Sequence, residues 1–162
     1  MSTAEAGQCA QDIMAWFTRS DCRMGKGADS VDFQRLEKTI DTELPPVLKI
    51  ILESVNGGLF FMDKKQLNTD EIADCAGQNE KSKAWKQGLI PFGSDGDTLL
   101  VVDTTRGDEV FEWDEDGLGD CLAPSLVRYL EDYRNALLGG SFEYLEDIGV
   151  VEKMGASKAP RK

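Results

Sequence analysis

Apolar side chains recur at helical spacing along the N-terminal part of the chain. Residues three and four apart share one face of an α-helix, because the helix turns once every ~3.6 residues. In residues 4–17 this stripe comprises Ala10, Ile13, Met14 and Phe17. A second stripe, in a helix that begins near Ser30, comprises Phe33, Leu36 and Ile40. The pattern predicts two amphipathic helices whose apolar faces contribute to a core.

A third helix has the best-marked boundaries. Pro45–Pro46 suits its first turn, where a missing backbone N–H costs nothing. The apolar stripe that follows comprises Val47, Leu48, Ile51, Leu52 and Val55. Asn56–Gly57 tolerates the left-handed backbone conformation that commonly ends a helix, so we expect this helix to end there with a positive φ at Gly57. A short buried strand is predicted next, at residues 59–62.

Residues 63–86 are polar and of mixed charge, and they predict a long surface connection with a helical turn at residues 68–75. From Leu89 the period changes to two, which is typical of strands. Strands are predicted at residues 89–92, 98–103 and 109–113. In the last of these the alternation predicts one exposed and one covered face.

The final element is a helix over residues 125–138, with Ser125 as its N-cap and Gly139 or Gly140 at its end. Helices, then strands joined by tight turns, then a helix indicate an α+β fold in which helices pack on an antiparallel β-meander. We expect three parts: an N-terminal helical extension at residues 1–29, the α+β domain at 30–145, and a flexible tail at 146–162.

Composition narrows the classes of partner. The 162 residues carry 30 acids and 18 bases, for a formal charge of −12, so the chain repels nucleic-acid phosphates and anionic membranes and favours a cationic protein. The N-terminus lacks a signal peptide's pattern and no apolar run is long enough to span a membrane, so a cytoplasmic protein is expected. The four cysteines form no C-x-x-C pair and are expected as free thiols. Histidine is absent, which removes the commonest general base and zinc ligand.

Residues 90–120 hold ten Asp or Glu against one basic residue, Arg106. Turn formation alone favours Asp, but this imbalance exceeds what turns require, so a partner-binding acidic face and a merely solvated face both remain open. Trp113 and Trp85 are candidate aromatic anchors for a partner or core residues. The candidate partner-binding residues are Asp95, Asp97, Asp108, Glu109, Glu112, Trp113, Asp114, Glu115 and Asp116.

The same carboxylates fit known catalytic and metal sites poorly. An EF-hand loop that starts at Asp114 would have Leu118 at its fifth position and Ser125 at its twelfth, where an oxygen ligand and a glutamate are needed. The glycines near residue 93 lack the Lys of a phosphate-binding loop. A small hydrolase or metal-binding protein that uses clustered carboxylates is kept as the alternative, and bound Ca²⁺ or Mg²⁺ would raise its melting temperature.

Several short motifs occur in a familiar order. Leu44–Pro45 precedes the apolar third helix, Asn56–Gly57 follows it, Trp85 comes next, and Ile90–Asp97 opens a hairpin before the last helix. In this order and spacing the chain resembles the SUKH superfamily, named partly for a yeast cell-wall assembly regulator. The resemblance covers about residues 30–140.

That resemblance implies an α+β fold, no catalytic residues, no cofactor and a function in binding other proteins. Bacterial members of the superfamily include immunity proteins that neutralise toxins, often nucleases, and eukaryotic members serve as regulatory or scaffold modules. The matching positions are implied to be caps and turns that determine the fold: Leu44, Pro45, Asn56, Gly57, Gly93, Asp95 and Gly96. The expected function is therefore a non-enzymatic protein-interaction module, acting either in toxin immunity or in regulation.

Overall fold

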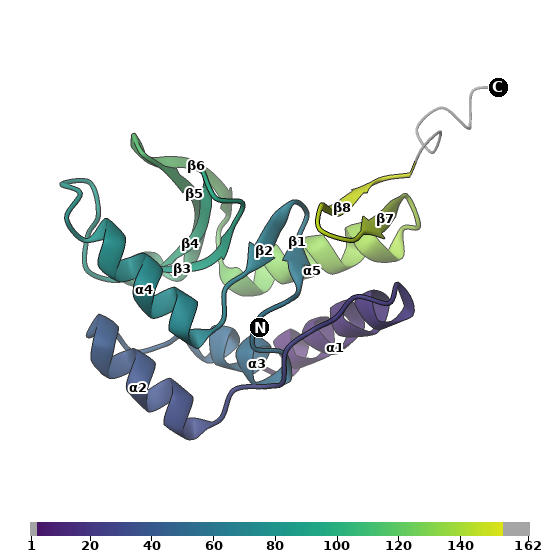
Figure 1. Cartoon of the computed structure of the whole chain (residues 1–162), viewed down its shortest axis with the longest axis horizontal. Coiled ribbons are helices and arrows are strands. Elements are labelled where there is room, and N and C mark those ends of the chain that lie inside the picture. The colour runs from purple at the N-terminus through teal and green to yellow at the C-terminus, as the bar shows by residue number, and fades with distance from the viewer. Residues whose placement is uncertain (1–2, 154–162) are drawn as a thin grey trace.

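The computed structural model describes residues 3–153, which form five α-helices and eight strands (Figure 1). The helices are α1 (Thr3–Arg19), α2 (Ser30–Ile40), α3 (Pro46–Ser54), α4 (Thr69–Asn79) and α5 (Leu126–Leu138). The strands are β1 (Phe60–Phe61), β2 (Lys64–Gln66), β3 (Leu89–Ser94), β4 (Leu99–Asp103), β5 (Glu109–Asp114), β6 (Gly117–Ala123), β7 (Phe142–Leu145) and β8 (Gly149–Glu152). A 3₁₀ turn, η1 (Thr104–Arg106), joins β4 to β5.

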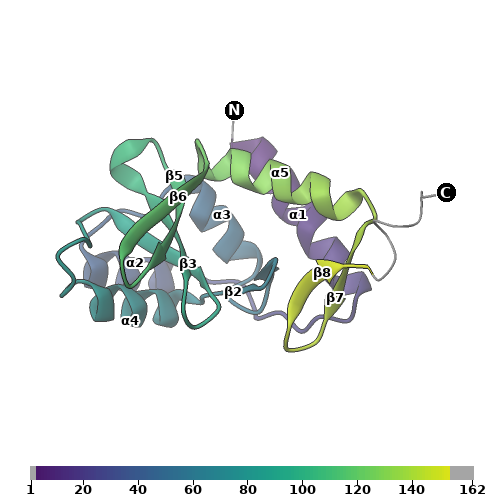
Figure 2. The same cartoon turned by 90° about the horizontal axis from the view of Figure 1, so that it is seen from above.

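Strands β1 to β6 form one sheet in sequence order, and every neighbouring pair is antiparallel. The predicted α+β fold with an antiparallel meander is therefore confirmed. Seen from above, α1 and α5 lie side by side on one side of the sheet, and α2 and α4 lie together on the other (Figure 2). Strands β7 and β8 form a separate hairpin.

Both faces of the central strands are covered. One face contributes Ile90, Phe92, Leu100, Val102 and Val110 to the main core. The other face forms a second cluster, which comprises Leu89, Leu99, Val101 and Trp113 and packs against Cys75 and Trp85. The prediction of one exposed face for residues 109–113 was therefore wrong. Helix α4 and the segment after it cover the side that the alternation left to solvent.

The buried side chain of Gln66 holds the loop between α3 and β1. Its Oε1 accepts hydrogen bonds from the backbone N–H groups of Gly57 at 3.1 Å and Leu59 at 3.4 Å. Its Nε2 donates to the carbonyl of Val55 at 2.7 Å. One side chain thus satisfies three backbone groups that the loop would otherwise leave unpaired in the interior.

Helix α3 ends earlier than predicted. It stops at Ser54, and Val55 is already extended, with φ −152°. Gly57 does have a positive φ of 100°, but so does Gly58 at 101°, and both lie in the loop rather than at the helix end. The expectation that Gly57 ends the helix was wrong, because the chain is already extended at Val55 and the carbonyl of Leu52, in the last turn, accepts the N–H of Ala28 at 2.8 Å instead of a left-handed cap.

The polar segment 63–86 is not a long surface connection. It contains β2 and the eleven-residue helix α4, which begins with a capping box between Asn68 and Glu71. The hydrogen bonds of this box run between each side chain and the other residue's backbone N–H, at 2.8 and 2.9 Å. Only Thr69, Ile72 and Ala76 are buried, so the apolar stripe was too sparse to predict a full helix.

The expected N-terminal extension packs into the main core. Phe17 of α1 is fully buried, and its ring lies 5.8 Å from that of Tyr144 in β7. The expected tail at 146–162 is partly ordered, because residues 149–152 form β8 and Val150 is buried. Val150 also donates its N–H to the carbonyl of Met62 at 2.9 Å. Residues 154–162 lie outside the described part of the chain.

Gln66→Leu tests the role of the buried amide. The substitution keeps the side-chain size but leaves three buried backbone groups without partners, so the free energy of unfolding is expected to fall by roughly 2–4 kcal/mol. Urea denaturation measures this, with Gln34→Leu on the exposed surface of α2 as the control. Equal urea midpoints for Gln66→Leu and the wild type would mean that water or another group satisfies the loop.

Candidate functional site

The register of the sheet divides the acidic stretch into two groups. Strand β4 pairs with β5 so that Leu99 lies opposite Trp113 and Asp103 lies opposite Glu109. At ~3.3 Å per residue the two ends of these strands are about 13 Å apart. We define the hairpin end as the β3–β4 and β5–β6 turns, which carry Asp95, Asp97, Asp114, Glu115 and Asp116. Asp108 and Glu109 lie at the opposite end, so the nine candidates do not form one face.

Two carboxylates of the hairpin end build its turns. Asp95 Oδ1 accepts the backbone N–H groups of Asp97 at 2.9 Å and Thr98 at 2.8 Å. Burial acts to raise the pKa of Asp95, but these N–H groups and the Lys64 ammonium together hold it below its usual value. Asp114 Oδ1 likewise accepts the N–H of Asp116 at 2.8 Å. Asp95 is therefore a structural residue of the turn.

Apart from Asp95, the carboxylates of the hairpin end, including Asp114, have no cation partner in the described part of the chain and face solvent. Asp97, Asp114, Glu115 and Asp116 are exposed, and within residues 3–153 no ion pair joins any of them to a cation. Glu112 is half-buried beside the same end, on the side of α5. Burial, and then the charges of Glu112 and Asp63, raise the pKa of Tyr129 in α5. The hairpin end thus carries a concentration of unneutralised negative charge.

The opposite end is neutralised internally. Lys86 Nζ lies 2.8 Å from Asp103 Oδ2, and Asp103 is fully buried. Arg106 Nε lies 3.1 Å from Glu109 Oε1. Asp108 is half-buried, and burial, followed by the charge of Asp103, raises the pKa of its carboxyl group. Asp108 and Glu109 are therefore poor candidates for attracting a distant cation.

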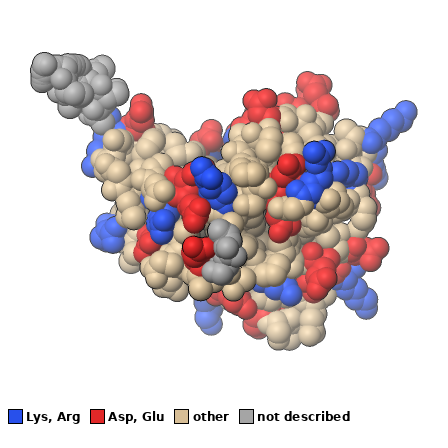
Figure 3. Space-filling view, turned by 180° about the vertical axis from the view of Figure 1, so that it is seen from behind, with Lys and Arg blue, Asp and Glu red and all other residues tan. Residues whose placement is uncertain are grey.

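Basic residues far away in the sequence also reduce the imbalance. Lys64 of β2 lies 3.6 Å from both Asp63 and Asp95. In the space-filling view, most basic side chains lie directly beside acidic ones, and acidic side chains gather on the upper rim (Figure 3). No local pattern in the sequence predicts the Lys64–Asp95 pair, because the β2–β3 register that brings these residues together is a tertiary feature.

Trp113 belongs to the core. Only 3% of its surface is exposed, and its ring meets that of Trp85 edge to face, with 4.8 Å between centroids. Its Nε1–H donates to Asn79 Oδ1 at 3.2 Å, so the polar atom of the indole is satisfied by α4. The suggestion that Trp113 anchors a partner was wrong, because its ring is not accessible.

The residues implied to determine the fold lie at buried or constrained backbone positions. Leu44 and Pro45 are buried ahead of α3. Asn56 Oδ1 accepts the N–H of Thr69 at 2.9 Å and so joins the α3–β1 loop to the start of α4. A Cβ at Gly93 would lie 3.1 Å from Leu100, and Gly96 has a φ of 101° at the tip of its turn.

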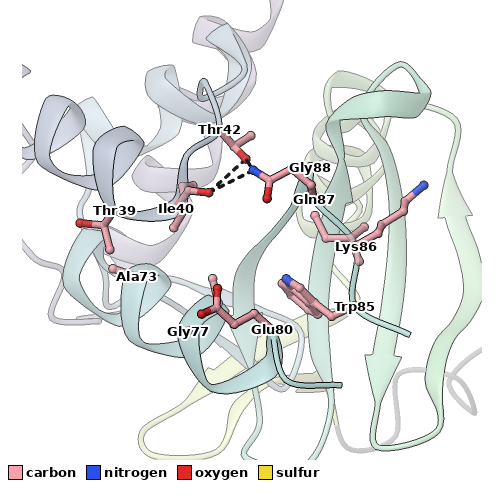
Figure 4. Close-up of a pocket in the computed structure, with 12 residues that line it drawn as sticks. Thr39, Ile40, Thr42, Ala73, Gly77, Glu80, Trp85, Lys86, Gln87 and Gly88 are labelled. Atoms are coloured by element: carbon pink, nitrogen blue, oxygen red, sulfur yellow. Dashed lines mark hydrogen bonds between the residues drawn. The ribbon is translucent and has the colours of Figure 1, made fainter. Parts of the chain in front are cut away.

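A hollow of about 170 Å³ lies between α2, α4 and residues 85–89 (Figure 4). Gln87 Nε2 donates to the carbonyls of Ile40 and Asp41 and to the hydroxyl of Thr42, and so joins the end of α2 to the sheet. The wall includes Trp85, Glu80 and the small residues Ala73 and Gly77. The hollow is smaller than the ~300–1,000 Å³ usual for small-molecule sites.

Three thiols of the described residues have raised pKa values, and these residues hold no metal-binding cluster. No group of three or more Cys, Asp or Glu side chains there could hold a metal ion. Burial raises the pKa of Cys9 and Cys22, and raises that of Cys75 to about 11. A cysteine nucleophile needs the opposite shift, because the thiolate is its reactive form.

The sequence profile of the SMI1 / KNR4 family (SUKH-1) matches residues 27–132, which is more than half of the chain. The chain belongs to the SMI1 / KNR4 family. The match includes α2 to α4, the whole six-stranded sheet and the start of α5, whereas α1 and the β7–β8 hairpin lie outside it. A search of curated proteins finds no match. No helix within residues 3–153 is long and apolar enough to cross a membrane.

Asp108→Asn tests the electrostatics of the neutralised end. The pKa of Asp108 is raised on folding, so its ionised form opposes folding at neutral pH, and its protonated form does not. Asn also tolerates the φ of 64° at this position. The variant is therefore expected to have a higher urea midpoint at pH 7.

That advantage should shrink as the pH falls through the folded-state pKa and disappear near pH ~3, where the carboxyl group is mostly protonated in both the folded and unfolded states. Urea denaturation at several pH values measures it, and Asp97→Asn, in an exposed turn, is the control. A difference that stays constant with pH would assign the effect to turn conformation and not to charge.

Proposed function

We propose that this SMI1 / KNR4 family protein is a non-enzymatic interaction module that binds a cationic surface of another protein through its hairpin end. The observation that carries the proposal is a group of exposed carboxylates that form no ion pair with any residue in 3–153: Asp97, Asp114, Glu115 and Asp116. Other acidic residues of the same stretch, such as Asp103 and Glu109, pair with bases of the chain itself.

Like charges on adjacent turns repel one another and lower the stability of the folded chain by a few tenths of a kcal/mol for each close pair. A cationic partner neutralises these charges, so binding removes the repulsion between the carboxylates and makes the binding free energy more favourable. Such fields act over about 8–10 Å at physiological salt and mainly raise the association rate. Specific short-range contacts then have to hold the partner.

Within this function, toxin immunity and intracellular regulation are the two roles that the family suggests. For a nuclease toxin the electrostatic argument is direct, because the surface that binds nucleic acid must be cationic. An acidic face placed over that surface would compete with the phosphates. A toxin encoded beside this protein would favour the immunity role, and a partner encoded elsewhere would favour the regulatory one.

The competing function is a small hydrolase or metal-binding protein that uses the same carboxylates. The division of the acidic residues between two ends about 13 Å apart gives that function less support. Ca²⁺ or Mg²⁺ bound to the folded state would raise the melting temperature by mass action. If the proposed function is correct, 5 mM Ca²⁺ or Mg²⁺ leaves the melting temperature within ~1 °C of the metal-free value. This concentration is several times the ~1 mM Kd of a weak calcium site, so a bound ion would be detected.

The main test uses charge reversal at the hairpin end. The variant Asp97→Lys/Glu115→Lys/Asp116→Lys is compared with Glu43→Lys/Glu53→Lys/Asp74→Lys, which changes the net charge equally at exposed acids elsewhere. The partner is first captured with the wild-type protein from lysate of the source cell, identified by mass spectrometry and purified. Association rates are then measured at low and high salt.

The hairpin-end variant should associate at least ~10-fold more slowly than the wild type at low salt, and high salt should reduce the difference. The control variant should keep the wild-type rate within about twofold, because its substitutions lie away from the hairpin end. Urea midpoints establish that both variants are folded. A rate that responds neither to salt nor to the hairpin-end substitutions would refute the proposal.

A further inference from the structure

The six-stranded sheet has one open edge among the described residues. Its strand order runs from β1 to β6, so these two strands are its edges. Beside β1 lies β8, and Val150 N–H donates to the carbonyl of Met62 just after β1. No strand lies beyond β6, and the β5–β6 hairpin extends past α4 and α5 (Figure 1). An edge strand presents backbone N–H and C=O groups that point away from the sheet and can pair with another strand.

Strand β6 is also the longest of the sheet and is open to solvent. It spans seven residues, and the five between Gly117 and Ala123 are all exposed. Leu118 is 40% exposed and Leu122 is 39% exposed, which makes them two of the six large exposed apolar side chains within residues 3–153. No backbone hydrogen bond joins β6 to a described residue outside the sheet. Free backbone groups and two leucines therefore lie together on one exposed strand.

The charges around β6 select against pairing with a second copy of the same edge. Asp120 lies in the middle of the strand, and the hairpin end, with Asp114, Glu115 and Asp116, lies immediately before it. Two copies of β6 paired antiparallel would bring their two Asp120 side chains close together, and like charges across neighbouring strands are destabilising. Asp120 and the carboxylates of the hairpin end thus make the middle and the start of this edge negatively charged, and a strand with Lys or Arg side chains is the occupant that complements it.

The pairing of β6 with β5 adds a second device against self-association. Ala123 lies opposite Val110, Cys121 opposite Phe111 and Leu118 opposite Trp113, so β6 has extra residues at two register shifts. Bulges of this kind bend a strand and interrupt regular pairing between identical edges. They leave a short edge on either side of each bulge, which a short extended peptide can still follow.

We infer that β6 is the docking edge for an extended basic segment of the partner protein, which adds to the sheet as a seventh strand. Backbone hydrogen bonds would hold this segment, its Lys and Arg residues would face Asp120 and the hairpin end, and its apolar residues would contact Leu118 and Leu122. The inference rests on the proposed function only in taking the partner to be cationic. It adds the short-range contacts that an acidic surface alone does not supply.

Cys121, in the middle of β6, supplies a site-specific reporter. It is exposed, whereas Cys9 and Cys22 are buried and Cys75 is half-buried. Burial raises the pKa of Cys75 to about 11, so at pH 8 very little of it is the reactive thiolate. Iodoacetamide should therefore alkylate Cys121 first. The fast alkylation should be absent from the Cys121→Ser variant, which assigns it to this residue. A strand bound along β6 would slow this reaction.

The probe is an eight-residue peptide of alternating Lys and Val with blocked termini. Its control has the same sequence and charge but carries N-methyl groups on alternate residues, which removes the backbone donors along one side. The first peptide should slow Cys121 alkylation at least ~10-fold in a saturable way, and the methylated peptide should not, because backbone pairing is its only missing interaction. Equal protection by both peptides, or protection by neither, would overturn the inference.

Two further variants separate this inference from the proposed function. Leu118→Asn/Leu122→Asn should weaken protection by the peptide at least ~5-fold while the hairpin end stays intact. Asp97→Lys/Glu115→Lys/Asp116→Lys should weaken protection by the unmethylated peptide, because its Lys side chains then lose carboxylates at the hairpin end. Two measurements with the native partner distinguish the proposals: the association rate of the charge variant, and the reactivity of Cys121 in the complex of the wild-type protein. If the charge variant associates more slowly but Cys121 stays fully reactive in the wild-type complex, the hairpin-end proposal survives and the β6 inference fails. In the absence of peptide, protection of Cys121 could rise with protein concentration. If it does, and the protein has the mass of a dimer, β6 is a self-association edge and the inference is overturned.

Discussion

The hydrogen bonds of the buried Gln66 amide are the interaction on which the arrangement of the helices around the sheet depends. It lies in β2 and bonds to the backbone at Val55, Gly57 and Leu59, so it fixes the chain's path from α3 into the sheet. Asn56, in the same loop, bonds to Thr69 and thereby places the start of α4. Helix α4 then covers the second face of the sheet, where Trp113 and Trp85 pack. The side-chain amides of Gln66 and Asn56 thus together set the positions of elements on both sides of the sheet.

Strand register determines which charges act together. Ten carboxylates in 31 consecutive residues suggested one acidic surface, yet the β-meander places the turns alternately at its two ends. Lys86 and Arg106 neutralise Asp103 and Glu109 at one end, whereas within residues 3–153 four exposed carboxylates of the hairpin end have no ion pair. The exposed β6 edge begins at that same end. Charge and free backbone groups are therefore adjacent, although neither feature requires the other.

Local signals in the sequence predicted the elements with strong apolar periodicity. The stripes of α1, α2, α3 and α5 were sufficient, because each records burial of one face of a helix. Strands β3 to β5 were predicted from the tight turns and apolar residues after Leu89, although both of their faces are covered. Helix α4 was predicted only as a helical turn, since only three of its residues are buried. Strand β6 was missed for a related reason, since its exposed residues carry no alternating pattern.

The sequence by itself determined the fold class, the family and the excess of negative charge, because these follow from periodicity, motif order and composition. Only the tertiary structure decided which carboxylates lack an ion pair within residues 3–153, that Trp113 is buried, and that β6 is an open edge of the described sheet. Each of these depends on contacts between residues distant in the chain, as in the pairs Lys86–Asp103 and Trp113–Asn79. No local pattern encodes such contacts, because they arise only when strands take their register and helices cover both faces of the sheet.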